Sequence, residues 1–235
     1  MTKGKLLLLP NVLGDVLHHE IFLPPSVDKA VSILDGLIAE SEKGGRRFLG
    51  RFQTKKRPQD IPIALLNKHT RDYDFLLEPV REGEVWGVVS DAGLPCIADP
   101  GARLVARAKE TGIKVQAFVG PSSLMMALMQ SGLNGQRFHF DGYLPKEPER
   151  RKERIEQLAK HSRQDGATQI FIEAPHRNKY TLEALLEVLG DETRLCVAWE
   201  LTLPTQGILT QEIALWKKSP LPAIEKKPAI FLFNF

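Results

Sequence analysis

Short apolar runs alternate with helical patterns through the first half of this chain, and this alternation restricts the fold more than any other feature. The apolar runs are typical of buried strands, and they lie near residues 5–9, 37–40, 61–66, 84–90 and 114–118. The helical patterns lie between them, near residues 26–35, 44–52, 71–81 and 101–111. This order predicts an α/β domain in which helices cover a parallel sheet.

The pattern changes after Val119, where the breaker Gly120-Pro121 predicts a domain boundary. Beyond it we predict strands near residues 138–140, 169–172, 195–199 and 229–233. Fewer helices accompany them, near residues 124–129, 145–164 and 180–189. The sequence therefore predicts two α/β domains, 1–119 and 120–235, each a parallel or mixed sheet flanked by helices.

The composition is that of an ordinary globular protein, because 43% of the 235 residues are hydrophobic and 26% are charged. No apolar run approaches the roughly 18 residues of a membrane span. The run Leu6–Leu9 ends at Pro10 and is too short for a signal peptide. We therefore expect a cytoplasmic protein that does not contact a membrane.

Nothing in the sequence predicts a metal site. The two cysteines, Cys96 and Cys196, lie in no C-x-x-C pair. The only histidine cluster is His18-His19-Glu20, and adjacent side chains are poorly placed to share one metal ion.

The stretch from Ser90 to Gly101, SDAGLPCIADPG, joins a predicted buried strand to a predicted helix. Open α/β sheets bind ligands at loops of this kind. Its glycines allow positive φ or close approach of the backbone to a ligand, and its prolines make the rest rigid. Asp91, at the end of the strand, is placed to accept hydrogen bonds from a ribose or an amino group. Because Asp, Gly and Pro are also ordinary turn residues, local chemistry supports a ligand site and a plain turn equally.

The net charge of +3 is small, but the basic residues are unevenly distributed. Residues 43–57, called the basic run below, contain no acid and seven cations: Lys43, Arg46, Arg47, Arg51, Lys55, Lys56 and Arg57. Clustered cations indicate a polyanionic partner, and we favour nucleic acid over a solvated helix face. A second cluster over residues 150–154 is interleaved with glutamates. There we favour a solvated helix with i,i+3 and i,i+4 ion pairs.

The turn Gly120–Ser123 precedes a predicted helix, and one of its serines is expected to cap that helix. The free N–H groups of the first turn are then available to a polar ligand. Three methionines follow, Met125, Met126 and Met129. They are typical of a core stripe, which we favour, or of a flexible ligand wall.

Several segments, in this order, resemble motifs of one protein family. The loop resembles the pattern SDAG-x-P-x-x-x-DPG, and Glu173–Arg177 and Glu200–Thr202 resemble its ESPHR and ELT segments. The segments 120–123, 131–133 and 138–145 match as well. Over about residues 84–202 the chain resembles the tetrapyrrole-methylase superfamily of class III S-adenosylmethionine (SAM)-dependent methyltransferases. Within it, the chain is most similar to the ribosomal RNA small-subunit methyltransferase I branch, which methylates a ribose 2′-hydroxyl.

The resemblance implies two α/β domains with SAM in the cleft between them, S-adenosylhomocysteine as product, and a homodimer. It implies SAM contacts from ten residues: Pro10, Asp91, Ala92, Gly93, Leu94, Pro95, Ser122, Ser123, Ile172 and Ala198. By family position, the candidates for a general base are Glu40, His69 and Glu173. Each also has a structural alternative, such as Glu173 anchoring Arg177. The phosphates of the acceptor are expected on the basic run and on His176 and Arg177.

Three N-terminal segments depart from the family pattern. The family segment PTPIGNLGD corresponds here to PNVLGD at Pro10–Asp15, and EDTR corresponds to ESEK at Glu40–Lys43. The family segment SYHEHN corresponds to residues 65–70 and retains only His69. The sequence predicts 2′-O-methylation of ribosomal RNA, either free or in the small subunit. The alternatives are a methyltransferase of a tetrapyrrole-like or other small acceptor, and a diverged SAM- or RNA-binding paralogue without activity.

Overall fold

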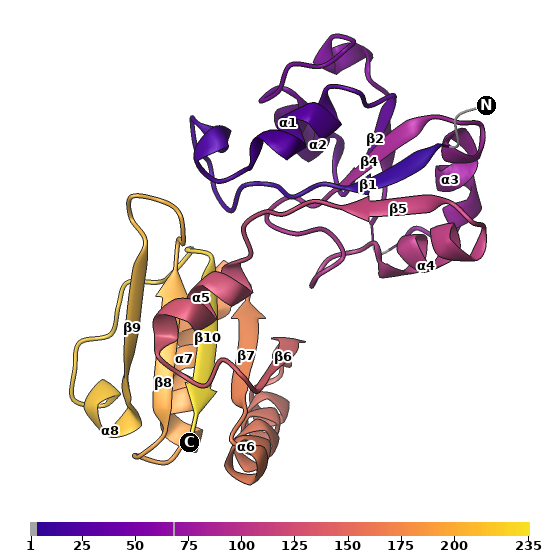
Figure 1. Cartoon of the computed structure of the whole chain (residues 1–235). Coiled ribbons are helices and arrows are strands. Elements are labelled where there is room, and N and C mark those ends of the chain that lie inside the picture. Colours follow the sequence, from indigo (N-terminus) through magenta and orange to yellow (C-terminus); the bar gives the residue numbers. More distant parts are fainter. Residues whose placement is uncertain (1–3, 68) are drawn as a thin grey trace. The chain divides into compact units, whose positions relative to one another are not determined.

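Two compact units make up the protein, one extending to Ser122 and the other running from Ser123 to Phe235 (Figure 1). The computed structural model describes residues 4–67 and 69–235. The first unit ends slightly beyond residue 119, where the sequence places the boundary. Each unit has its own sheet and its own hydrophobic core.

The sheet of unit 1 is entirely parallel, as predicted, with strand order β3-β2-β4-β1-β5. Its strands are β1 (Lys5–Leu8), β2 (Gly36–Ala39), β3 (Ile63–Leu65), β4 (Val85–Val89) and β5 (Lys114–Ala117). Helices cover both faces of a sheet of this kind, which is why its central strands are nearly continuous apolar runs. Successive residues of a central strand therefore pack into different buried clusters, one on each face of the sheet. Leu6 belongs to one buried cluster and Leu7 to the other, as the two-residue period of a strand requires.

Among the described residues of unit 1, four helices supply the covering layers: α1 (Pro25–Val31), α2 (Glu42–Leu49), α3 (Tyr73–Arg81) and α4 (Ala102–Glu110). Val27 of α1 and Phe48 of α2 lie in one core cluster, and Leu77 of α3 and Leu104 of α4 lie in the other. Two short 3-10 helices, η1 (His19–Ile21) and η2 (Pro58–Asp60), lie in the connections. These elements follow the predicted alternation closely.

The sheet of unit 2 is mixed, with strand order β6-β7-β10-β8-β9. Its strands are β6 (Phe138–Tyr143), β7 (Thr168–Glu173), β8 (Arg194–Trp199), β9 (Gly207–Glu212) and β10 (Ala229–Asn234). Only β6 and β7 pair in parallel, while β10 lies between β7 and β8 and is antiparallel to both. The edge strand β9 was not predicted from the sequence.

The helices of unit 2 lie on the two faces of its sheet: α5 (Ser123–Ser131), α6 (Pro148–Asp165), α7 (Asn178–Val188) and α8 (Ile213–Trp216), with η3 (Pro175–Arg177) before α7. The helix α5 contacts β10 and β9 on one face, and α6 and α7 cover the other (Figure 1). Phe171 and Phe231 stack on the α6–α7 side with ring centroids 5.6 Å apart. Among the described residues, no helix is long and apolar enough to cross a membrane.

The methionine stripe of α5 is not core, contrary to the prediction. Met129 is 82% exposed and Met125 is 38% exposed. Leu124, Ala127 and Leu128 form the buried side of this helix instead. The leucines and the alanine share one helical face, so Met125 and Met129 are turned outward, whereas Met126 is half-buried.

The ion pairs predicted within the cluster at residues 150–154 are also wrong. Lys152 Nζ pairs with Glu187 Oε1 at 2.6 Å, and Arg154 pairs with Asp141. Arg151 is buried and donates from Nε and Nη2 to the carbonyl oxygens of Pro145 and Lys146, at 3.1 and 2.6 Å. Contacts with distant elements therefore replace the pairs along the helix.

Candidate active site

The predicted loop and two other loops meet at the carboxyl edge of the sheet in unit 1. The strands β2, β4 and β1 are neighbours and parallel, so the segments that follow them leave the sheet on the same side. These segments are residues 9–15 after β1, Glu40 and Ser41 after β2, and the loop 90–101 after β4. Ligands of open α/β sheets bind at this edge.

Asn11 fastens the first of these segments to the loop after β4. Its buried amide donates from Nδ2 to the carbonyl oxygens of Ser90 and Asp91, each at 3.0 Å. Its backbone N–H donates to Gly93 O at 2.8 Å, and its Oδ1 accepts from Val12 N at 2.9 Å. The short polar side chain thus replaces a ladder of backbone hydrogen bonds between two loops.

Three carboxyl groups, those of Glu40, Asp91 and Asp99, interact electrostatically at this edge. The backbone N–H of Asp91 donates to Glu40 Oε1 at 3.0 Å. Burial, with a smaller effect from Asp91, raises the pKa of Glu40 above its usual value. Burial and the charge of Glu40 raise the pKa of Asp99 to about 6, although a hydrogen bond from Ser90 opposes this. The edge therefore concentrates negative charge that a cation would relieve.

The loop 90–101 has an unusual backbone. Cys96 and Ala98 have φ of 69° and 64°, values that residues with a Cβ adopt rarely. Gly93 and Gly101 also have positive φ, at 70° and 141°. A Cβ at residue 101 would lie 2.5 Å from Cys96 Sγ, so only glycine fits. Such conformations persist where the surrounding structure holds them, and they concentrate at functional sites.

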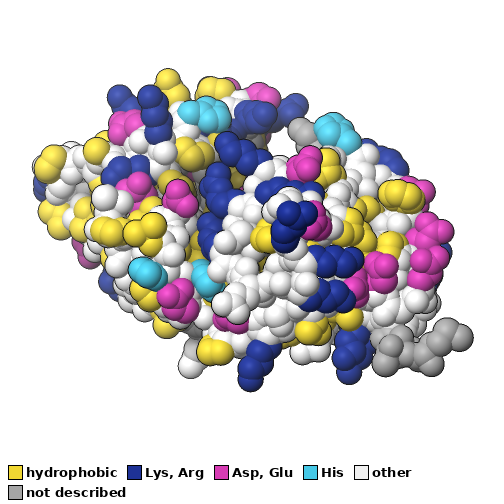
Figure 2. All heavy atoms as spheres, turned by 90° about the horizontal axis from the view of Figure 1, so that it is seen from above, with side chains coloured by type: hydrophobic (Ala, Val, Ile, Leu, Met, Phe, Trp, Pro, Cys, Tyr) yellow, Lys and Arg dark blue, Asp and Glu magenta, His cyan; other side chains and the backbone are white. Residues whose placement is uncertain are grey.

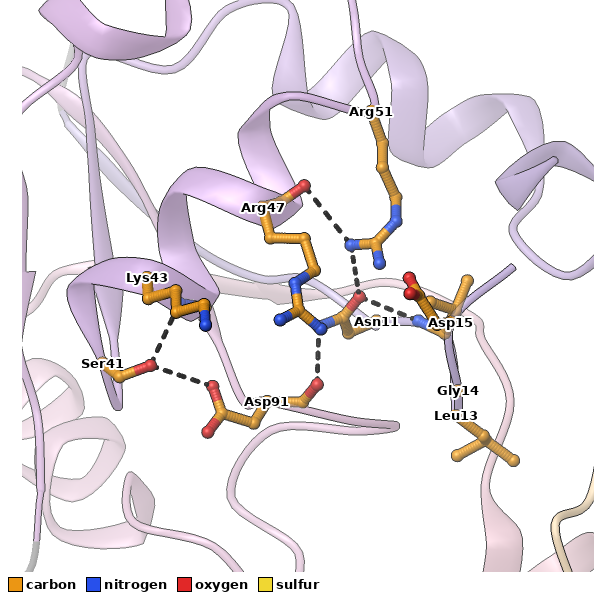
Figure 3. Close-up of a pocket in the computed structure, with 11 residues that line it drawn as sticks. Asn11, Leu13, Gly14, Asp15, Ser41, Lys43, Arg47, Arg51 and Asp91 are labelled. Carbon is orange, nitrogen blue, oxygen red and sulfur yellow. Dashed lines mark hydrogen bonds between the residues drawn. The ribbon is translucent and has the colours of Figure 1, made fainter. Parts of the chain in front are cut away.

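A cavity of ≈ 360 Å³ lies beside the carboxyl edge of unit 1 (Figure 3). The helix α2 begins at its rim, where Ser41 Oγ caps the helix by accepting from Gly44 N at 3.0 Å. Ser41 Oγ also donates to Asp91 Oδ1 at 3.4 Å. The cavity is lined by Asn11, Val12, Leu13, Gly14, Asp15, Ser41, Lys43, Gly44, Arg47, Arg51 and Asp91.

The basic run is divided by the structure. Lys43, Arg47 and Arg51 line the cavity. Three other members of the run form contacts elsewhere. Arg46 donates to the carbonyl oxygens of Pro58 and Ile61 at 2.7 and 2.6 Å, Lys55 pairs with Asp35, and Arg57 Nε pairs with Asp60 Oδ2 at 2.7 Å. The absence of acids within the run therefore did not mean that its cations are unpaired. Figure 2 shows several Lys and Arg side chains gathered on one part of the face it presents.

The predicted SAM residues fall into one group in each unit. Pro10 and residues 91–95 belong to unit 1. Gly120 packs tightly against Pro10, because a Cβ at residue 120 would lie 2.0 Å from Pro10 Cβ. Ser122 ends that unit, and Ser123 begins α5. In unit 2, Ile172 and Ala198 lie on either side of Ile230, which pairs with both across the sheet.

Glu173, a candidate base, is buried and fully bonded. Its Oε1 accepts from Arg177 Nε and from Ala174 N, both at 2.7 Å, and its Oε2 accepts from Thr181 Oγ1 at 2.9 Å. Arg177 also donates to Leu144 O at 3.0 Å. This arrangement supports the anchor alternative for Glu173. It occupies Nε and Nη2 of the guanidinium expected to bind phosphate and, among the described residues, leaves its buried Nη1 without a hydrogen-bond partner.

The two histidines among the predicted site residues lie on the surface. His69 is exposed, and its backbone N–H donates to Asn67 Oδ1 at 2.9 Å. His176 is exposed on η3. Lys68, which lies in the same family segment as His69, is outside the described residues.

Three residues at this edge were not among the predicted site residues: Asn11, Ser41 and Asp99. Each follows a predicted strand or lies in the loop 90–101, so the position of a polar residue after a strand was the signal that was available. Sequence spacing alone did not reveal that Asn11 joins two loops or that Asp99 lies near Glu40.

A family model described as tetrapyrrole (corrin/porphyrin) methylases matches residues 20–215. A relative from Xylella fastidiosa, named ribosomal RNA small subunit methyltransferase I, is 34% identical over 215 residues, covering 91% of this chain and 74% of its own. Relatives with the same name from Vibrio cholerae and Thermotoga maritima are 39% and 31% identical. They cover 87% and 94% of this chain and 67% and 96% of their own.

Two solved structures have the same fold. The methyltransferase CobJ superposes with a TM-score of 0.66 at 17% identity, covering 98% of this chain and 94% of its own. The uroporphyrin-III-C-methyltransferase from Thermus thermophilus superposes with a TM-score of 0.57 at 16% identity, with the same coverage. At these identities the likeness concerns the fold, which both share with the two α/β units described above.

Proposed function

The chain belongs to the tetrapyrrole (corrin/porphyrin) methylase family, and from that premise we propose that it is a SAM-dependent methyltransferase of small-subunit ribosomal RNA. The observation that carries the acceptor is the name shared by relatives that are 31–39% identical over most of this chain. The three cations that line the cavity agree with a polyanionic acceptor. We further propose that the methylated atom is a ribose 2′-oxygen.

The charge at the carboxyl edge of unit 1 fits SAM as the methyl donor. SAM carries a sulfonium and an ammonium group, and Glu40, Asp91 and Asp99 together present carboxyl groups that a cation would stabilise. We assign SAM contacts in unit 1 to Pro10 and residues 91–95. The assigned contacts from the remaining chain are Ser122, Ser123, Ile172 and Ala198.

The donor supplies a methyl group already activated for transfer. As the methyl moves from sulfur to the acceptor oxygen, the S–CH₃ bond breaks, the O–CH₃ bond forms and the hydroxyl proton must leave. Glu40 is the favoured base, because its raised pKa makes it a better proton acceptor than an ordinary carboxylate. His69 is the alternative candidate for the general base. Alignment of the acceptor with the methyl–sulfur bond would provide much of the rate.

The test is transfer of labelled methyl from SAM to small ribosomal subunits that lack the native modification. Naked ribosomal RNA and a tetrapyrrole mixture are assayed in parallel. We expect label in the RNA, at a ribose that then resists alkaline cleavage. Label in the tetrapyrrole mixture alone would mean that the acceptor is a small acid rather than RNA. SAM binding without transfer to any acceptor would indicate a binding protein.

Variants of the carboxyl edge test the site itself. Asp91→Ala should abolish measurable SAM binding in calorimetry, and Glu40→Gln should lower kcat far more than it weakens SAM binding, because Asp91 and Asp99 still face the cation. Glu82→Gln is the matched control for the loss of one carboxylate. Glu82 is exposed and follows the last residue of α3, outside the segments that form this edge. Unchanged SAM affinity in Asp91→Ala would refute the assignment of that loop.

We also propose that the protein is cytoplasmic, as the composition indicates, and that it forms a homodimer, as the family resemblance implies. Light scattering during size-exclusion chromatography tests the dimer. A mass near the 26.4 kDa of one chain would contradict it.

A further inference from the structure

The cavity of unit 1 is bounded by two of the segments in which this chain departs from the family pattern. Residues 11–15 supply one wall, and the other wall runs from Ser41 along α2 to Arg51. Its volume of ≈ 360 Å³ lies within the range of small-ligand sites, roughly 300–1,000 Å³. Part of the lining of this cavity, residues 11–15, Ser41 and Lys43, therefore departs from the family pattern.

Lys43, Arg47 and Arg51 follow one another at intervals of four residues, so they lie along one side of α2 and its continuation. The side chains of Arg47 and Arg51 both extend from this side toward Asn11 (Figure 3). Within residues 4–67 and 69–235, no ion pair is recorded for Lys43 or Arg47. Their neighbours Arg46, Lys55 and Arg57 are all paired with acids.

Arg51 is only weakly satisfied by the groups around it. Its Nη1 donates to Asn11 Oδ1 at 3.5 Å and to Arg47 O at 3.4 Å, which is the long limit of a hydrogen bond. Burial and the charge of Arg47 lower the pKa of Arg51, although Asp15 opposes them. The cavity thus holds a half-buried guanidinium beside a second one, and an anion would stabilise both.

We propose that this cavity is a subsite for one phosphodiester group of the RNA acceptor, held by Arg47 and Arg51, which sets the register of the RNA on the enzyme. A phosphodiester has two unesterified oxygens, and each guanidinium can donate two parallel hydrogen bonds to such oxygens. Asp15 and Asp91 lie on the walls of the same cavity, and Asp15 interacts with Arg51, so a phosphate competes with Asp15 for this guanidinium. The subsite rests on the proposed RNA acceptor, and it is more specific than attraction by the basic run as a whole.

The experiment measures binding of a labelled fragment of small-subunit ribosomal RNA by fluorescence anisotropy, across a series of KCl concentrations. It compares the full chain with Arg47→Gln, Arg51→Gln, the double variant and Arg103→Gln. Arg103 lies on α4, is exposed and does not line the cavity, so it is a matched control for the lost charge. Circular dichroism confirms that each variant is folded.

Each cavity variant should weaken binding by about tenfold or more, the cost of losing hydrogen bonds to a charged group. If one phosphate is held by both side chains, the slope of log K against log[KCl] changes little in either single variant, because the remaining guanidinium still neutralises that phosphate, and it falls by about 0.7 in the double variant. Arg103→Gln should leave affinity and slope close to those of the parent. A fall of about 0.7 in each single variant that adds up in the double variant would mean two separate phosphates, and an unchanged slope in the double variant would mean none. Either result overturns the proposal.

Asp15→Asn provides a test in the opposite direction. Asp15 competes with a phosphate for Arg51, so its neutralisation should tighten RNA binding several-fold, which mere structural damage would not do. Weaker binding in this variant would contradict the subsite. Because binding needs no turnover, the two proposals fail separately. A chain that binds RNA through the cavity but transfers no methyl group refutes only the proposed function, and methylation with an unchanged slope in the double variant refutes only the subsite.

Discussion

Neutralising Asp99 should stabilise unit 1 above neutral pH, although the substitution removes a charged residue from a family motif. The reason is that Glu40 and Asp91 face Asp99 at the carboxyl edge, and burial disfavours its charge. Its pKa rises from 3.8 to about 6 on folding. Since the folded chain holds this proton more tightly than the unfolded chain, folding stability falls as the pH rises from about 4 to 6.

The magnitude follows from the size of the pKa shift. A rise of about two units corresponds to about 3 kcal/mol once Asp99 is fully ionised, at about 1.4 kcal/mol per unit. Asp99 is only partly buried, so solvent screening reduces this figure, and we expect about 1–2 kcal/mol. About a third of the penalty has developed by pH 4.5, and all of it is present at pH 8.

The assay is urea unfolding of the parent and Asp99→Asn at pH 4.5 and at pH 8, followed by circular dichroism. The gain in stability of the variant should be larger at pH 8, by about 1 kcal/mol. Glu82→Gln serves as the control and should show no such difference. An equal gain at both pH values would refute the argument, because a change in packing does not depend on pH. A variant less stable than the parent at pH 8 would mean that the hydrogen bond from Ser90 outweighs the repulsion.

Three further substitutions test local features of the fold. Gly36→Ala should cost about 1–3 kcal/mol in urea unfolding, because the new Cβ would lie 2.3 Å from the indole of Trp86. Glu173→Ala should cost about 3–5 kcal/mol by leaving Arg177 charged and unpaired in the interior. The turnover of the remaining folded protein should be unchanged, and its loss would restore the role of Glu173 as a base. Ser41→Ala removes the cap of α2 and should lower the melting temperature by the equivalent of about 1 kcal/mol, whereas an unaltered melting temperature would show that the cap contributes nothing.

The parallel sheet of unit 1 could be predicted because its signal is local. Each central strand is a short apolar run between turn residues, and neighbours such as Leu6 and Leu7 are both apolar since both faces of the sheet are covered. The loop 90–101 was found for a similar reason, as its glycines and prolines stand out between a strand and a helix. Local patterns of this kind need no knowledge of distant residues.

The features that were missed depend on partners far away in the sequence. The edge strand β9 pairs only with β8 and is partly exposed, so its apolar pattern is weak. The acid that pairs with Lys55 is Asp35, outside the basic run, and only the fold brings them together. In the same way, Asn11 acts across 79 and 80 positions of sequence to reach the loop after β4. Long-range pairing of this kind cannot be deduced from spacing.

Because of the position of β10, the two units can complete their sheets at different times during synthesis. The sheet of unit 1 is complete once residue 117 has emerged from the ribosome, so this unit can fold while the rest is still being made. Unit 2 must wait for residues 229–234, because β10 separates β7 from β8. A chain interrupted before that point would expose one open edge on each of two apolar strands, β7 and β8, and each is a template for pairing with another molecule. Premature termination should therefore yield aggregates seeded by unit 2, attached to an intact unit 1.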